Sequence, residues 1–335
     1  MKRRIRFALL AASAALLALS SCNKEEGRPQ EGDRADFTIE VMGSLMTRST
    51  GNTGENEGKV NNLQVLVFDD HGIMETYKSA DGVTAMNLTS TSGPKTIWAV
   101  VNAPSLSAAT SLNDINGTVS DLTDNALDSY VMTGSLQSEI TNGAVISIHV
   151  KRMASKVILK KITTAFPDTP AYAGKTLSVS ALYLINVAKT VNFSLAGAPT
   201  AWFNKLGHYD TEGDYFLYDQ VGQTLANGES YSVVHDFYPY PNNVTTSVKE
   251  IAADQRGTWS PRRTILVIEA TVGDVSGYYP IELPVLERNT KYEIDEVVIT
   301  RTPGPYPYDP IETGEASVSI TIDDWDLVTI GTITI

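Results

Sequence analysis

The order of hydrophobic and polar positions along the chain predicts many short β-strands and very little helix. In the stretch "DFTIEVMG", Phe37, Ile39 and Val41 alternate with polar residues, and this period of two indicates a half-buried strand. The runs "LQVLVFD" (63–69) and "TIWAVVN" (96–102) are apolar almost without interruption. Such runs are typical of central strands in a sheet.

Further strand signals follow along the rest of the chain, in "GAVISIHVKR", "ASKVILKKI", "LSVSALYLINV", "TILVIEATV", "YYPIELPV" and "KYEIDEVVIT". The third of these segments places six alternating residues on one expected face: Leu177, Val179, Ala181, Tyr183, Ile185 and Val187. The only helix-like stretch covers residues 112–134 and is interrupted by Gly117. Repeated short strands separated by Gly, Pro and Asn turn signals predict β-sandwiches.

A chain of 335 residues is longer than one compact core usually serves, so two domains are expected. The predicted divisions are a signal peptide at 1–21, a tether and first strand at 22–48, an N-terminal domain at 49–153, a C-terminal domain at 154–315 and a C-terminal appendage at 316–335. Thr47 to Asn62 is rich in Gly, Asn, Ser and Thr and predicts a long exposed loop. Residues 301–315 hold four prolines and separate the last two strands from the body.

The end of the chain is strand-like rather than a polar tail. "ASVSITID" alternates cleanly, and in the final run "DLVTIGTITI" the apolar set changes phase around Gly331, which is consistent with a bulge. An exposed apolar strand is an aggregation hazard, so this strand must pair with something. The residues alone leave open whether it pairs with its own sheet or with another molecule.

The start of the chain carries an export signal. Four basic residues precede an apolar segment, Phe7 to Leu19, of about 13 residues, which is too short to span a bilayer. The segment closes with "LSSC", the pattern of a bacterial lipoprotein signal, and Cys22 is the only cysteine. A lone thiol has no disulfide partner, so we expect Cys22 to be lipidated.

Composition and charge exclude several classes of partner. The net charge is −13, and because residues 1–21 hold four of the 26 basic groups, the chain from Cys22 onward has 22 basic against 39 acidic groups, a net −17. That balance argues against nucleic acid as a partner, since phosphate neutralisation needs a basic face. It also disfavours electrostatic attachment to anionic lipid.

Catalytic and metal-binding patterns are weak in this sequence. The histidines His71, His149, His208 and His235 lie far apart, without a second His or Cys at ligand spacing. "NDING" begins like a calcium loop but lacks the closing Glu, so a turn is expected there. "DDWD" (323–326) is read as a polar turn. We therefore expect no enzyme activity, no metal and no cofactor.

Arg48 follows the first strand and precedes the Gly/Ser/Thr-rich loop. Exposed loops of this composition are preferred sites of proteolysis. Cleavage between Arg48 and Ser49 would detach the lipid, the tether and the first strand together. Composition alone nevertheless favours an ordinary surface arginine.

Taken together, the motifs resemble those of the Bacteroidales fimbrillin family, the lipoprotein-derived major subunits of type V pili. The resembling segments are "LSSC", "LQVLVFD", "YVMTGS" (130–135), "VKRMASKVIL" (150–159), "YPYPN" (238–242), "ERNTKYEIDEVVI" (287–299) and "SVSITIDDWDLV" (317–328). Each motif is diffuse, and their order and spacing along essentially the whole chain carry the resemblance.

The resemblance implies an all-β fold of two tandem transthyretin-like Greek-key sandwiches. It also implies that an arginine-specific protease cuts at Arg48, which reverses the interpretation from composition. The segment Phe37 to Leu45 would then be the displaced strand, with Phe37, Ile39 and Val41 as its apolar residues. The donor strand for a neighbouring subunit would be formed by Leu327, Val328, Ile330, Ile333 and Ile335. Whether Ala316 to Ile322 or the last strand inserts stays open.

The function implied is that of a structural subunit of a surface fimbria, in the stalk because the chain has both a donor tail and a cleavage site. Its partners would be copies of itself, anchor and tip subunits, the protease, and the outer membrane through the lipid of the precursor. The alternative is a surface lipoprotein that binds glycans without polymerising, with Trp202, Trp259 and the "FYPYP" loop as aromatic platforms.

Overall fold

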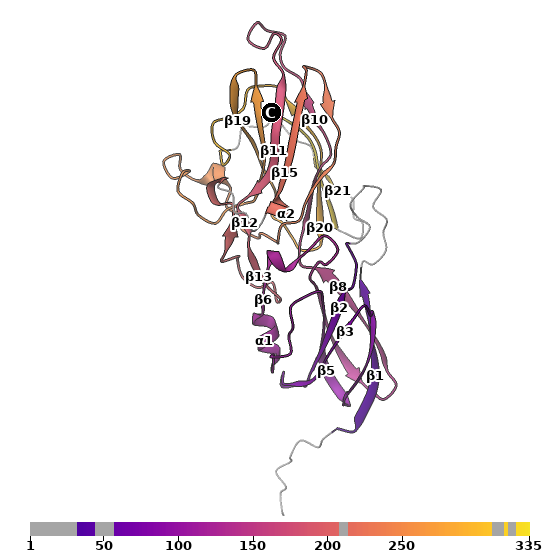
Figure 1. Cartoon of the computed structure of the whole chain (residues 1–335). Coiled ribbons are helices and arrows are strands. Elements are labelled where there is room, and N and C mark those ends of the chain that lie inside the picture. Colours follow the sequence, from indigo (N-terminus) through magenta and orange to yellow (C-terminus); the bar gives the residue numbers. More distant parts are fainter. Residues whose placement is uncertain (1–31, 44–56, 208–213, 310–317, 321–325) are drawn as a thin grey trace, which may run out of the picture.

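The computed structural model describes residues 32–43, 57–207, 214–309, 318–320 and 326–335. In this part the chain forms two β-rich domains joined end to end, and their long strands run roughly along the long axis of the molecule (Figure 1). The predicted all-β architecture of two sandwich domains is confirmed.

The first domain is a seven-stranded arrangement in the order β3-β2-β5-β7-β8-β1-β4. Its elements are β1 (Arg34–Gly43), β2 (Asn62–Phe68), β3 (Met74–Asp81), β4 (Ala85–Thr91), β5 (Gly93–Val101), α1 (Leu112–Gly117), β6 (Val119–Asp121), the 3₁₀ helix η1 (Leu122–Asp124), β7 (Met132–Ile140) and β8 (Val145–Arg152). The strands fold into two layers because β8 belongs to both: its C-terminal end pairs with β7, and the rest pairs with β1.

A glycine allows β8 to change layers at that point. A Cβ atom added to Gly134 of β7 would lie only 2.1 Å from the carbonyl oxygen of His149 in β8, a distance that no real Cβ adopts. Glycine therefore permits the close approach of the two backbones.

The core of the first domain explains the uninterrupted apolar runs. Leu63, Val65 and Val67 of β2 face the core between the two layers, together with β1. Leu66 and Phe68 face the opposite side and join a second cluster that continues into the second domain. Strand β2 lies between β3 and β5, so the prediction of a central strand, buried on both faces, is confirmed.

The second domain packs a four-stranded sheet, β15-β11-β18-β19, against a sheet whose main path is β16-β10-β20-β22-β21 and which also holds β9 and β17. Its elements are β9 (Lys156–Leu159), β10 (Ile162–Thr164), β11 (Leu177–Ile185), β12 (Val187–Ala188), β13 (Thr190–Asn192), β14 (Trp202–Phe203), η2 (Lys205–Gly207), α2 (Asp214–Leu217), β15 (Tyr218–Leu225), β16 (Ser230–Tyr231), β17 (His235–Phe237), η4 (Val248–Glu250), β18 (Ile265–Val272), β19 (Val275–Glu282), β20 (Thr290–Ile299), β21 (Val318–Ile320) and β22 (Asp326–Thr334).

Three sequence-based expectations need correction. The six residues from Leu177 to Val187 do not share a face, because a register shift between Val179 and Ala181 moves Ala181, Tyr183 and Ile185 to the other side of β11. The helix-like stretch yields only the six-residue helix α1, after which the chain enters β6. The expected exposed loop is not exposed at its described end, since Glu57 is buried.

A short, buried junction joins the domains. Only Met153, Ala154 and Ser155 lie between β8 and β9, and all three are fully buried. The amide of Met153 donates to Val131, the amide of Ser155 donates to Pro239, and the carbonyl of Ala154 accepts from the amide of Asn289. The motifs "YVMTGS", "VKRMASKVIL", "YPYPN" and "ERNTKYE" thus meet at this one place.

Candidate functional site

Strand β1 lies inside the first domain rather than at its edge. It pairs antiparallel with β4, from Arg34 opposite Thr91 to Glu40 opposite Ala85. On its other side it pairs parallel with β8, over residues 38–43. Both edges of β1 are therefore hydrogen-bonded, and without β1 the edges of β4 and β8 would face each other across an empty position. We call this position the β1 slot.

The apolar side chains of β1 fill the core. Phe37, Ile39 and Val41 are 2%, 0% and 4% exposed, so the alternation predicted from the sequence is confirmed. Ala35, which the sequence analysis did not include, is the fourth inward residue at 1% exposure. At roughly 1.5–3 kcal/mol for each large buried side chain, these residues are a major part of what holds β1 in place.

The walls of the slot are complementary to β1. Ile146, Ile148 and Val150 of β8 and Met86 and Leu88 of β4 are buried in the same cluster as β1. Both β1 and β8 keep a single alternating phase along the slot. Any strand that replaces β1 must therefore present apolar residues at every second position on one face.

The β4 wall is fastened independently of β1. The carboxylate of Glu75 in β3 accepts hydrogen bonds from the Ser90 hydroxyl (2.5 Å), the Thr91 hydroxyl (2.8 Å) and the Lys95 ammonium (2.8 Å). Burial raises the pKa of the Glu75 carboxyl, but these bonds outweigh burial and hold the pKa below its ordinary value. The carboxylate thus ties β4 to β3 and β5.

The β8 wall is fastened at the junction. The guanidinium of Arg288 donates to the carbonyls of Thr133 (3.0 Å), Lys151 and Arg152 (3.2 Å), at the start of β7 and the end of β8. Desolvation lowers the pKa of Arg288 to about 10, which leaves it charged at neutral pH. The two walls of the slot are therefore held by contacts that do not involve β1.

The C-terminal strand β22 lies on its own second domain. It runs parallel to β20, from Asp326 beside Thr290 to Thr334 beside Val298, and antiparallel to the short strand β21. The chain end is fixed as well, because the Ile335 amide donates to the Val298 carbonyl at 2.8 Å. In the single chain, the last strand thus pairs with its own sheet.

The predicted donor residues occupy this strand. Ile333 and Ile335 are buried at 3% and 2% exposure, and Leu327, Val328 and Ile330 lie in the described backbone of β22. The phase change predicted around Gly331 has a counterpart in β20, which buries Tyr292 and Ile294 and then Val297 and Ile299. The two adjacent strands keep one register across this change.

Other predicted positions lie outside the described residues. These are Cys22, Arg48, Ser49, His208, residues 323–325 and most of the segment 316–322. The structure ends its first described segment at Gly43 and resumes at Glu57, so the predicted cleavage position lies between the two. None of the helices in the described part is long and apolar enough to cross a membrane.

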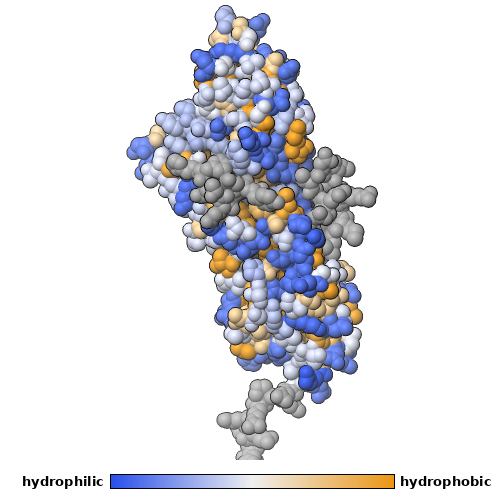
Figure 2. Space-filling view, viewed as in Figure 1, coloured by the Kyte–Doolittle hydropathy of each residue, from blue (hydrophilic) through white to orange (hydrophobic). Residues whose placement is uncertain are grey.

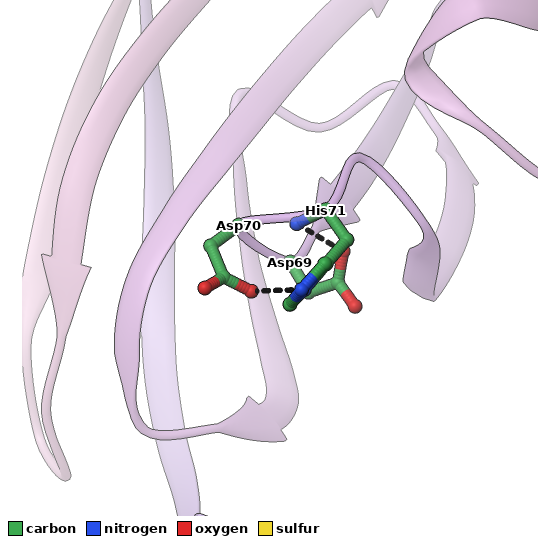
Figure 3. A group of neighbouring side chains, drawn as sticks. All are labelled: Asp69, Asp70 and His71. Atoms are coloured by element: carbon green, nitrogen blue, oxygen red, sulfur yellow. Dashed lines mark hydrogen bonds and ion pairs between the residues drawn. The ribbon is translucent and has the colours of Figure 1, made fainter. Parts of the chain in front are cut away.

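The turn between β2 and β3 brings three possible metal ligands together, Asp69, Asp70 and His71 (Figure 3). The Asp69 carboxylate accepts from the amides of His71 (2.9 Å) and Ile73 (2.7 Å), and His71 Nδ1 lies 2.6 Å from Asp70. These are the contacts of an Asx turn closing a hairpin. "NDING" is likewise a structural element, because Asp114 completes a capping box with Ser111 at the start of α1.

The aromatic residues proposed as glycan platforms are largely enclosed. Trp202 is 5% exposed and packs edge-on against Trp259, with the ring centroids 5.7 Å apart. Phe237, Tyr238 and Tyr240 of the "FYPYP" loop are fully buried. On the face shown in Figure 2, hydrophobic side chains form small patches among hydrophilic ones.

The best-formed hollow in the described part has a volume of about 550 Å³. Val119 of β6, residues 195–200, Pro241 and Val285 line it, and no aromatic residue does. It therefore offers no aromatic stacking surface.

Comparison with known families gives one sequence match. The model of the family described as major fimbrial subunit protein (FimA) matches residues 35–178, a range that includes β1 and both walls of the slot. Among curated proteins, no sequence matches the chain.

Solved structures share the fold. Fimbrilin from Porphyromonas gingivalis W83 is 14% identical with a TM-score of 0.61, covering 90% of this chain and 97% of that one. A protein from Bacteroides eggerthii that is described as a cell adhesion protein is 18% identical with a TM-score of 0.63, covering 91% of this chain and 100% of that one. The tip fimbrial protein Mfa3 from P. gingivalis is 11% identical with a TM-score of 0.51, covering 78% and 93%.

Proposed function

We propose that this chain, whose residues 35–178 match the model of the major fimbrial subunit family, is a stalk subunit that polymerises by donor-strand exchange. In this reaction the β1 slot of one subunit is emptied and then filled by the C-terminal strand of the next. The role is structural and needs no catalytic group.

The position of β1 is the observation that carries the proposal. The strand is inserted between β4 and β8, holds four inward apolar residues, and ends at Gly43, five residues before Arg48. Cleavage after Arg48 would leave it attached to the subunit by non-covalent contacts alone. A strand held in this way exchanges with any competitor that offers equal hydrogen bonding and equal apolar area.

The competitor is the C-terminal strand of a second copy. Strand β22 already runs parallel to the last long strand of its own domain, as β1 runs parallel to β8. Its five large apolar residues correspond to roughly 8–15 kcal/mol of gross burial, part of which is offset by association and ordering. Since donor and slot are different surfaces, the contact is heterologous and grows into a filament instead of closing a dimer.

The N-terminal signal supplies the route to the surface. Cys22 after "LSS" is the proposed lipidation site, which would hold the precursor on the outer membrane until an arginine-specific protease removes the lipid and β1 together. The mature subunit would then join copies of itself and the anchor and tip subunits of a cell-surface fimbria.

Limited trypsin treatment of the purified precursor tests the proposal. We expect monomers before treatment and, afterwards, filaments by electron microscopy with SDS-resistant ladders on gels. Arg48→Ala is expected to stay monomeric after treatment, and deletion of residues 326–335 is expected to give a trimmed, folded monomer that forms no ladder. Ladders from the deletion variant would overturn the assignment of the donor strand.

A further inference from the structure

Glu57, the first described residue after the proposed cleavage position, is inserted into the domain junction. Its side chain is 7% exposed, and Oε1 accepts from the Lys156 ammonium at 2.7 Å and from the Tyr238 hydroxyl at 2.8 Å. Its backbone carbonyl accepts from Nε of Arg152 at 2.8 Å. Three elements, namely β8, β9 and the segment after β17, therefore hold this one residue.

Positively charged side chains lie on both sides of Glu57. Lys156 is 3% exposed and also lies 3.0 Å from the Asp236 carboxylate. The ammonium group is thus shared by two buried carboxylates, and loss of either would leave charge in a poorly solvated place. The guanidinium of Arg152 adds positive charge on the backbone side of Glu57.

The chain remains bound from Glu57 up to strand β2. The carbonyl of Lys59 accepts from the Asn102 side chain at 2.8 Å, and the Lys59 ammonium lies 3.0 Å from Asp128. The amide of Asn61 donates to Asn102 Oδ1 at 2.8 Å. The backbone of 57–61 is therefore held at successive points, although it forms no regular element until Asn62.

We propose that Glu57 anchors the new N-terminal segment of the trimmed subunit in the domain junction and protects it from further proteolysis, an inference that rests on the proposed removal of β1 by cleavage after Arg48. Arg48 and Lys59 are consecutive basic residues in the sequence, so trypsin, which accepts lysine as well as arginine, has two positions at which to cut and serves as the probe of this anchor. Cleavage requires the backbone to leave its contacts and enter the protease, and resistance follows burial and hydrogen bonding.

The difference between the two positions matters for the subunit. A cut after Arg48 frees β1 and leaves β2 attached to its anchored lead-in segment. A cut after Lys59 would remove Glu57 from the junction and leave β2, a central strand of the first domain, without that segment. Glu57 is thus a positioning residue that keeps the trimmed domain intact while its slot opens.

The test is limited trypsin treatment of the precursor, read by intact mass and N-terminal sequencing. The wild-type product is expected to begin at Ser49. In Glu57→Ala, cleavage after Lys59 is expected to accelerate at least tenfold, so that the product begins at Val60. Glu57→Gln, which loses the charge but keeps the shape, is expected to lie between them.

Glu282→Ala is the matched control. Glu282 is a partly buried carboxylate of the second domain, bonded to Ser247, the Val248 amide and Arg263, far from Lys59 in the fold. Its loss destabilises the protein without touching the anchor, so its product is expected to begin at Ser49. A wild-type product beginning at Val60, or a Glu57→Ala product that still begins at Ser49, would overturn the inference.

The readout separates this inference from the proposed function. Adding Arg48→Ala to Glu57→Ala removes the first cut, and cleavage after Lys59 is still expected to be fast. If trimming after Arg48 occurs but β1 stays bound and no filaments form, the proposed polymerisation fails while the role of Glu57 stands.

Discussion

Strands β1 and β22 are alike in direction and different in how they are held. Each runs parallel to the last long strand of its domain, β1 beside β8 and β22 beside β20. On its second side β1 pairs with the whole of β4, whereas β22 pairs, among the described residues, with Val318–Ile320 of β21. One strand fills the interior of a sheet, and the other lies near an edge.

This difference assigns the two strands opposite roles. Release of β22 breaks its long ladder with β20 and its ladder with β21, and leaves β20 with one open edge. An interior strand leaves two open edges and an exposed apolar core, so it departs only if a replacement arrives. Under the proposed exchange, the comparison therefore indicates that β22 suits the role of the donor strand and β1 that of the displaced strand.

The largest expected effect comes from weakening β1 in the precursor. Ile39 is fully buried, and Ile39→Ala is expected to destabilise the first domain by about 2–5 kcal/mol through lost burial and the cavity left behind. After trypsin trimming and exchange, the variant and the wild type should have the same stability, because residue 39 is gone. Thermal unfolding before and after trimming measures this, and a difference that survives trimming would show that β1 never left.

A smaller effect should reveal which face of the donor enters the slot. In a straight strand Leu327, Ile333 and Ile335 share one face and Val328 and Ile330 share the other, while the slot accepts a single phase. The face with three apolar residues matches the apolar walls of the slot better than the face with two. Ile333→Ser is expected to slow ladder formation more than tenfold, corresponding to about 2 kcal/mol of lost burial, and Ile330→Ser much less.

Gel densitometry over time after trimming makes that comparison, with the melting temperature of each untrimmed variant as the control for damage to the second domain. Equal slowing by both variants would mean that β22 changes phase around Gly331 when it occupies the slot.

The smallest expected effect concerns the β4 wall. Because the pKa of Glu75 is lowered in the folded protein from its ordinary value of 4.5, its stabilisation is present above that pH and is lost as the pH falls through the folded pKa. Glu75→Gln should cost about 1 kcal/mol at neutral pH and very little in strong acid. Urea unfolding between pH 7 and pH 3 measures the difference, and a constant gap between variant and wild type would contradict the assigned ion pair.

The sequence predicted most of the strands because alternation and apolar runs are local signals. The inward set Phe37, Ile39 and Val41 was readable in this way. The position of β1 between β4 and β8 was not readable, because parallel pairing joins residues about a hundred positions apart and has no local pattern. For the same reason, the residues alone left open whether β22 pairs with its own sheet or with another molecule.

Two further features could not be predicted from the sequence, each for a different physical reason. The bulge after Val179 reverses the faces of β11 through one extra residue, and no Gly or Pro marks it. Glu57 sits in a polar stretch that reads as a loop, and only the Lys156 and Tyr238 side chains, distant in sequence, make its burial favourable. The sequence signal was a lysine, Lys156, next to the apolar run of "ASKVIL". It could have prompted a search for a carboxylate partner.

The three-residue link between β8 and β9 has a mechanical consequence for a filament built in this way. A pull on a neighbour's strand seated beside β8 passes through Met153, Ala154 and Ser155 into β9, on to β20 and out through β22. These strands run roughly along the long axis of the molecule (Figure 1), so tension applied along that axis would load their hydrogen bonds together in shear and would not peel them one by one. With no slack in the link, the subunit should transmit force without stretching.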